Sequence, residues 1–175
     1  MTVFTCRVLD GGSSVRGALL DRMMAEGLAD TALYDAPAGA FRDAWNCITS
    51  PETSWLVEVQ AHFSLPGGQG CDTAAVAWFN NFTGRTALSH FCVFRAFQPQ
   101  AVAIGRHVLR WIFGTGHFDC LTGLTPAPYR HALHLARSIG FVPMGRVPGA
   151  CHLVRWGRHV DGILSVCTPD EGEIL

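Results

Sequence analysis

Two short apolar segments, residues 87–94 and 118–124, flank a stretch whose apolar residues recur with the period of a helix. In that stretch Ala101, Ile104 and Val108 fall on one side, and the helical pattern ends at a Gly-Thr-Gly sequence. A strand, a helix and a second strand in this order form a crossover, whose two strands pair in parallel. The chain is therefore expected to be an α/β protein with a parallel pair in the middle of its sheet.

The segment before the crossover has the period of two that is typical of strands. Trp55, Val57 and Val59 alternate with polar residues, and the apolar run 74–79 follows after a Gly-rich loop. Short polar loops that contain glycine connect antiparallel neighbours. Residues 55–94 are therefore expected to form a three-stranded antiparallel meander.

The remaining elements complete an order of strand, two helices, three strands, helix, strand, helix and two strands. This order predicts an α/β fold with one mixed sheet of about seven strands and helices on both faces. We expect one domain over residues 1–157 and a C-terminal tail over 158–175. The other ranges expected are a strand at 3–9, helices at 14–27, 41–45 and 126–139, and a closing hairpin of 141–147 with 151–156 around Pro148-Gly149.

The charge balance and the cysteines narrow the class of protein. The 13 basic residues, all arginine, and 14 acidic residues give a net charge of −1, which argues against a nucleic-acid partner. No apolar run approaches the roughly 20 residues that cross a bilayer, so we expect no membrane partner. The N-terminus does not resemble a secretory signal, and the seven cysteines form no C-x-x-C pair. We expect a cytoplasmic protein with reduced, mostly buried thiols.

The start of the crossover helix has features of a phosphate site. It reads Gln100-Ala101-Val102-Ala103-Ile104-Gly105-Arg106. A helix N-terminus presents free N–H groups and the positive end of the helix dipole, and small side chains allow a phosphate to approach. Arg106 and Arg110, one turn apart, add positive charge. Ordinary close packing of small residues is the alternative interpretation of the same pattern.

The element order and two short motifs resemble the GNAT N-acetyltransferase superfamily. The family signature, Gln or Arg followed by x-x-Gly-x-Gly/Ala, is similar to Gln100-x-x-Ala103-x-Gly105, with Ala at the first Gly. The family also has a habitual Gly-Phe junction between helix and strand, which Ser138-Ile139-Gly140-Phe141 resembles. The resemblance covers residues 3 to about 157.

This resemblance implies an acetyl-CoA-dependent N-acyltransferase that acts on a small-molecule or peptide amine by direct attack, with acetyl-CoA (or CoA) as co-substrate. The fourth and fifth strands would separate, with the pantetheine arm between them and the pyrophosphate on the first turn of the helix. A main-chain N–H near Val93 or Phe94 would be the oxyanion donor. The cofactor-binding residues implied are Phe91, Val93, Phe94, Gln100, Ala101, Val102, Ala103, Gly105, Arg106 and Arg110.

The catalytic side chains match the family less well. His90, on the fourth strand, is the candidate base, and Glu58 is a second candidate. The family's Tyr position is Ala136 here, so Tyr129 is the candidate acid in its place. The usual Asn after the fifth strand is also missing. The structural alternatives are a strand His without a role, a solvated carboxylate and a packing tyrosine.

Two further hypotheses stay open at this stage. His131 and His134 lie three apart on one helix, but no third ligand is evident, so no metal site is expected. A catalytically silent GNAT-fold binding or assembly protein, of the kind that phages and prophages encode, is the alternative function. The tail would then serve self-association, for example as a homodimer. Residues 29–54 and 62–73 are expected to be the loops that shape the acceptor pocket.

Overall fold

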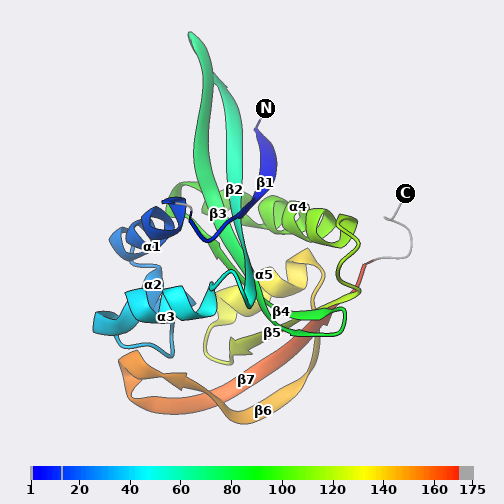
Figure 1. Cartoon of the computed structure of the whole chain (residues 1–175). Helices are drawn as coiled ribbons and strands as arrows, with labels where there is room; N and C mark the ends of the chain where they lie inside the picture. Colours follow the sequence, from blue (N-terminus) through cyan, green and yellow to red (C-terminus); the bar gives the residue numbers. More distant parts are fainter. Residues whose placement is uncertain (1, 13, 170–175) are drawn as a thin grey trace.

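The computed structural model describes residues 2–12 and 14–169 and contains one mixed sheet in the order β1-β2-β3-β4-β5-β7-β6 (Figure 1). Its strands are β1 Val3–Leu9, β2 Ser54–Leu65, β3 Gly68–Thr83, β4 Thr86–Val93, β5 Cys120–Pro126, β6 Val142–Leu153 and β7 Arg158–Cys167. Its helices are α1 Val15–Ala25, α2 Ala29–Ala32, α3 Phe41–Ile48, α4 Ala101–Gly114 and α5 Arg130–Ile139, with 3-10 turns η1 Ala38–Ala40, η2 Arg95–Gln100 and η3 Val154–Trp156.

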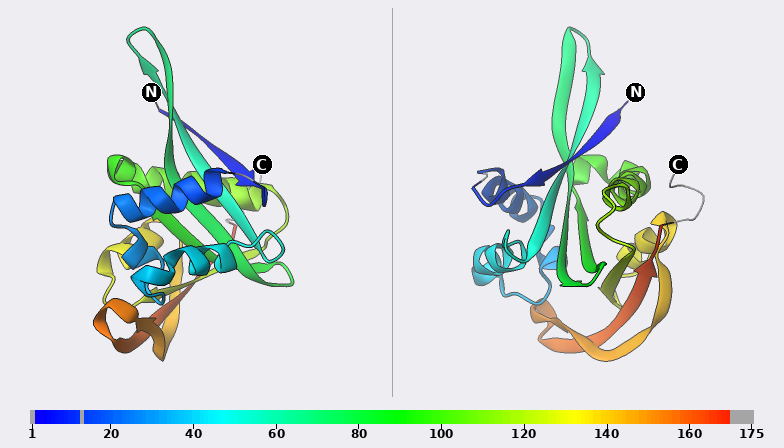
Figure 2. Two further views of the ribbon diagram at one scale, coloured as in Figure 1. Left: turned by 60° about the vertical axis from the view of Figure 1, so that its left-hand side comes forward. Right: turned by 45° about the vertical axis from the view of Figure 1, so that its right-hand side comes forward.

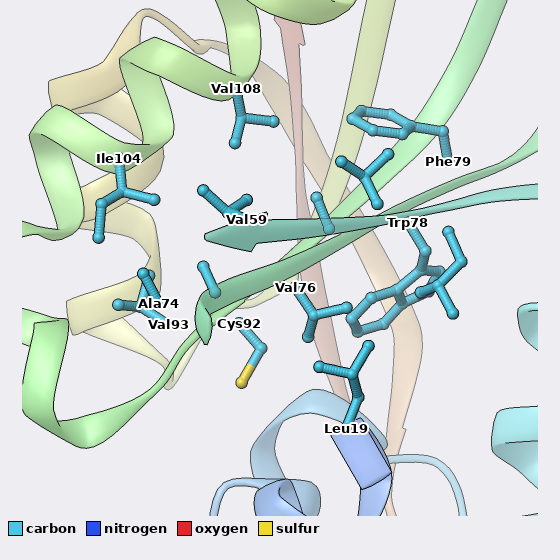
Figure 3. Packing of buried hydrophobic residues seen from close by; sticks show 14 of the residues in the cluster. Leu19, Val59, Ala74, Val76, Trp78, Phe79, Cys92, Val93, Ile104 and Val108 are labelled. Atoms are coloured by element: carbon cyan, nitrogen blue, oxygen red, sulfur yellow. The ribbon is translucent and has the colours of Figure 1, made fainter. Parts of the chain in front are cut away.

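Helices cover both faces of the sheet. Helices α1, α2 and α3 lie on one side, and α4 and α5 lie on the other (Figure 2). Leu19 of α1 packs against the sheet from one side, opposite Ile104 and Val108 of α4 (Figure 3). Because both faces are covered, the central part of β3, residues 74–79, is buried on both sides and reads as a continuous apolar run.

The structure confirms the predicted α/β architecture. β4 and β5 pair in parallel, whereas the β1–β2, β2–β3 and β3–β4 pairs are antiparallel. The expected loop at 62–73 is wrong, however, because β2 and β3 continue through it and turn only at Pro66-Gly67. The two strands form a hairpin that extends beyond the helices (Figure 1). Gly67 has a φ of 102°, a conformation that glycine adopts without strain.

The expected tail at 158–175 is wrong over its first part. Residues 158–167 form β7, which lies inside the sheet between β5 and β6. The expected closing hairpin is also wrong, because 142–153 is one strand with an irregular register between Val147 and Cys151. The turn lies instead at η3, which ends at Gly157 with a φ of 57°. The part of the predicted tail from residue 170 lies outside the described residues.

β7 contains Gly162, a residue type that is uncommon inside strands, and the sequence analysis did not predict this strand. A Cβ on Gly162 would lie 2.6 Å from Leu124 Cδ1 and 3.1 Å from Cys151 Sγ. The glycine thus allows β7 to pass close to both neighbouring strands, which is one of the specific uses of glycine inside a strand. The sequence analysis had assigned all residues after Gly157 to a tail.

The seven cysteines are free thiols, and their burial varies more than predicted. Cys92, Cys151 and Cys167 are buried, Cys6 and Cys120 are partly buried, and Cys47 and Cys71 are exposed. Among the described residues, none of the helices combines the length and apolar character that a membrane crossing demands.

Gly105 is where α4 and α5 approach closely, so it has a packing role, while its part in a phosphate site stays a prediction. A Cβ at this position would lie 2.8 Å from Ile139 Cγ2 and 3.5 Å from Ile139 Cβ. Arg106 reinforces the same contact, since its guanidinium donates to Ser138 O at 2.9 Å. The small residue is therefore explained by helix packing, the alternative that the sequence had left open.

We predict that Gly105→Ala destabilises the protein by about 1–3 kcal/mol, because the added methyl overpacks the contact with the branched Ile139 side chain. The matched control is Gly17→Ala in α1, where a Cβ meets nothing within 4 Å. That change should stabilise by about 0.5–1 kcal/mol through helix propensity. Urea unfolding measures both; equal effects of the two substitutions would show that α4 and α5 do not pack closely at Gly105.

Candidate functional site

The sheet opens between β4 and β5. Their parallel pairing covers only Thr86↔Cys120, Ala87↔Leu121 and Leu88↔Thr122. At the fork Ser89 Oγ donates to Thr122 O at 2.8 Å. Beyond it β4 remains paired with β3, and β5 remains paired with β7. The carboxyl ends of the two strands therefore have no ladder between them.

A cavity of about 630 Å³ occupies this opening. Its lining comes from both faces of the sheet: from the α1–α2 region on one side and from α4 and α5 on the other. The lining residues are Leu28, Thr31, Ala32, Tyr34, Trp78, Ser89–Val93, Gln98, Ala101, Val102, Gly123–Pro126, Tyr129, His131, Ala132, His134–Ala136, Ile139, Phe141 and Ser165.

The main chain of β4 offers unpaired groups to this cavity. The Phe94 N–H donates to Ala74 O at 3.0 Å, so it faces β3. N–H directions alternate along an antiparallel ladder, so those of Phe91 and Val93 face the opposite edge, toward β5. Both residues line the cavity. Phe94 does not line the cavity: it is fully buried beneath the Arg22 guanidinium, and its role in cofactor binding stays a prediction.

The start of α4 is more enclosed than the sequence suggested. The 3-10 turn η2 runs directly into the helix, and the Ala101 N–H donates to Gln98 O. Ala101 and Val102 line the cavity, whereas Gln100 and Ala103 do not. The predicted amide seat over the whole of 100–106 is therefore reduced to the side of the first turn that carries Ala101 and Val102.

A second cavity, of about 400 Å³, lies between α4, α5 and the end of β7. Arg106, Arg110 and Arg137 line it. Ile139 lines both cavities, so the two adjoin at this side chain. The structure thus places the predicted Arg106 and Arg110 together with a third arginine that the sequence analysis had not singled out.

His90 lines the larger cavity and is held from two directions. Its ring stacks on Trp78 with centroids 4.9 Å apart and an interplanar angle of 3°. Its Nε2 lies 3.2 Å from Asn80 Oδ1, while Asn80 Nδ2 donates to Ile48 O at 3.3 Å. Since this second bond directs the amide oxygen toward the ring, Nε2 carries the proton and Nδ1 keeps the free lone pair.

Burial lowers the pKa of His90 from 6.5 to about 4. The desolvated cationic form is disfavoured, so the imidazole is neutral at neutral pH. A neutral ring can accept a proton that is released during a reaction. It is too weak a base to remove a proton from an alkylammonium ion in a separate step.

The structure places Glu58 outside the cavity lining. Its side chain is buried, and its oxygens accept from Arg7 at 2.5 Å, Thr73 Oγ1 at 2.6 Å and Gln60 Nε2 at 3.3 Å. A carboxylate satisfied in this way ties β1, β2 and β3 together. It is not positioned beside His90 in the cavity.

Tyr129 lies in the cavity beside Tyr34, a residue that the sequence analysis missed. Their rings meet edge to face with centroids 6.2 Å apart. Burial raises the pKa of both phenols. Tyr129 is the residue before α5 rather than part of the helix. These are the only two tyrosines in the chain, and they lie about 95 positions apart. No local pattern in the sequence indicates that they meet.

Residues 29–54 and 62–73 differ in their relation to the cavity. Thr31, Ala32 and Tyr34 of the first segment line it, whereas no described residue of the second does. His131 and His134 also line the cavity. Among the described residues, no three His, Cys, Asp or Glu side chains gather in a way that would hold a metal ion.

We predict that His90 makes the protein less stable as the pH falls. The unfolded chain takes up the proton near pH 6.5, but the folded chain takes it up only near pH 4. Acid therefore favours unfolding, and wild type should lose about 2–3 kcal/mol more than His90→Gln on going from about pH 7 to about pH 4. Urea midpoints measure this, with exposed His134→Gln as the control that follows wild type. Parallel curves for wild type and His90→Gln would contradict the prediction.

Comparisons with known proteins identify the fold. No protein-family model and no curated protein sequence matches the chain. A ribosomal-protein-S5-alanine acetyltransferase from Vibrio fischeri is 12% identical with a TM-score of 0.70, covering 96% of this chain and 94% of that one. A spermidine N-acetyltransferase from Vibrio cholerae, in complex with CoA and spermine, is 15% identical with a TM-score of 0.65, covering 94% and 95%. Together with the mixed sheet and its open central pair, these matches show that the chain has the fold of the GNAT N-acetyltransferase superfamily.

Proposed function

We propose that this protein is an acetyl-CoA-dependent N-acyltransferase that transfers an acetyl group to a small-molecule or peptide amine. The observation that carries the proposal is the opening between β4 and β5, with its cavity of about 630 Å³. Similar solved structures are named as acetyltransferases, and one of them contains CoA.

The pantetheine arm would bind along the free edge of β4. The main-chain groups of Phe91 and Val93 face the cavity and have no strand to pair with. An extended amide-containing chain can pair with such an edge as an added strand does. The N–H of Val93 is the proposed donor to the oxyanion that develops on the thioester carbonyl.

The nucleotide end would lie toward the second cavity. Arg106, Arg110 and Arg137 supply positive charge there, and the Ile139 side chain lies between the two cavities. Phosphate groups pair favourably with guanidinium groups. This arrangement supports a ligand with an anionic end near the arginines and an uncharged arm in the larger cavity.

Acetyl-CoA would supply the activated acetyl group: the amine nitrogen bonds to the carbonyl carbon, the C–S bond breaks, and the sulfur leaves with the proton that the nitrogen loses. The chain's part is to hold the amine beside the thioester and to exclude water. We propose the neutral His90 imidazole as the relay for that proton and the Tyr129 hydroxyl as a donor toward the sulfur.

A catalytically silent binding protein is the second candidate, and one observation favours it. Ala136 lines the cavity at the position where the family resemblance implies a tyrosine. An alanine cannot donate a proton to a leaving sulfur. Acetyl-CoA binding without release of free thiol in the presence of an acceptor amine would distinguish this function from catalysis.

We predict that acetyl-CoA binds and that Val102→Glu weakens the binding at least about tenfold, because its carboxylate would lie beside an anionic ligand at the start of α4. Val102 lines the cavity and is 36% exposed, so a polar side chain is tolerated there. The matched control is Val147→Glu on β6, also exposed and outside the cavity lining. Isothermal titration calorimetry measures all three proteins.

Two results of the calorimetry would contradict the proposal. Undetectable binding of acetyl-CoA and CoA at millimolar concentration would exclude an acyl-CoA-dependent enzyme. Equal weakening by Val102→Glu and Val147→Glu would place the binding site elsewhere.

A further inference from the structure

One side of the larger cavity is suited to the acceptor molecule. That side is formed by α2 and by the face of β4 that carries His90, opposite the side formed by α4 and α5. Thr31, Ala32 and Tyr34 lie there together with the stacked Trp78 and His90. Its chemistry therefore indicates which amines fit.

This side of the cavity is uncharged. Among the described residues that line the cavity there is no Asp, Glu, Lys or Arg. Three carboxylates lie near the cavity but outside its lining. Asp30 faces Arg155 at 3.9 Å, Glu26 binds Arg22 at 2.8 Å and the Arg95 N–H at 2.6 Å, and Asp35 is exposed beside Tyr34. A cationic amine would lose its hydration here without direct contact with a counterion, which is unfavourable.

Aromatic rings replace charge as the main recognition groups. Tyr34 and Tyr129 meet edge to face, and His90 covers one face of the Trp78 indole. Trp78 is only 1% exposed and supports His90 from behind, so Tyr34 and Tyr129 are the rings that can contact a flat molecule. The walls are therefore better matched to an aromatic body than to a flexible polyamine.

From these features we infer that the acceptor is an aromatic amine, uncharged at neutral pH, whose ring lies beside Tyr34 and Tyr129. This inference rests on the proposed function and specifies its substrate class. Delocalisation of the lone pair into the ring keeps an arylamine neutral, so no proton has to leave before the attack. The nitrogen bonds to the acetyl carbon, the C–S bond breaks, and the one proton that the nitrogen loses goes to the departing sulfur. The low pKa of His90 agrees with this, because the ring has only to relay a proton released during the transfer.

The test compares amines matched in shape but not in charge. The probes are p-anisidine, an arylamine with an ether oxygen; 4-methoxybenzylamine, its alkylammonium counterpart; and spermidine. With acetyl-CoA and wild-type protein, kcat/KM for p-anisidine should exceed that of either other amine by at least about tenfold at neutral pH. The rate with p-anisidine should change little between about pH 6.5 and 9, whereas that with 4-methoxybenzylamine should rise.

Two outcomes overturn the inference. One is a kcat/KM for spermidine or 4-methoxybenzylamine equal to or above that for p-anisidine. The other is acetyl-CoA binding by calorimetry without acetylation of p-anisidine. Failure of acetyl-CoA to bind at all would instead remove the proposed function, and calorimetry distinguishes that case from the other two.

A charge introduced into the cavity provides a second test that does not depend on absolute activity. Thr31 lines the cavity and is exposed, so Thr31→Asp should fold. Its carboxylate should shift the preference toward 4-methoxybenzylamine by about fivefold, the effect of one partly exposed ion pair. Thr31→Asn, which has the same size without the charge, should keep the wild-type preference. An unchanged preference in Thr31→Asp would overturn the inference.

Discussion

The central constraint in this structure is that β4 and β5 share only three residue pairs. Each strand is paired along most of its length on its other side, β4 with β3 and β5 with β7. The sheet therefore consists of two halves that meet at one short joint. An Arg85–Asp119 ion pair at 2.5 Å lies next to the joint, before the strands separate. All the space for a ligand in the middle of the sheet follows from this early divergence.

The helices hold the two halves together where the strands do not. Helix α4 follows β4 and helix α5 follows β5, so their contact joins the half-sheets across the opening. Gly105 permits this contact by leaving room for Ile139, and Arg106 ties α4 to the Ser138 carbonyl. A residue that resembles part of a phosphate motif in the sequence thus has a packing role between the two helices.

Charge is distributed unevenly along the two adjoining cavities. The smaller one carries three arginines, while the described lining of the larger one carries no charged side chain. The electrostatics would therefore favour the anionic end of a bound ligand in the smaller cavity and its uncharged part in the larger one. The neutral state of His90 has the same origin, because burial in an uncharged lining disfavours the imidazolium.

The sequence by itself determined the crossover, the meander and the helix that ends at Gly140, because hydrophobic period and glycine caps are local properties. The family resemblance grouped His90, Phe91, Val93, Ala101, Val102 and Tyr129 as candidate site residues, and all six line the larger cavity. Only the tertiary structure decided the rest. The Phe94 N–H direction, the use of Gly105, the satisfied oxygens of Glu58 and the meeting of Tyr34 with Tyr129 all depend on partners distant in the sequence. Such partners leave no periodic trace in the chain, because the contact is made between elements and not within one.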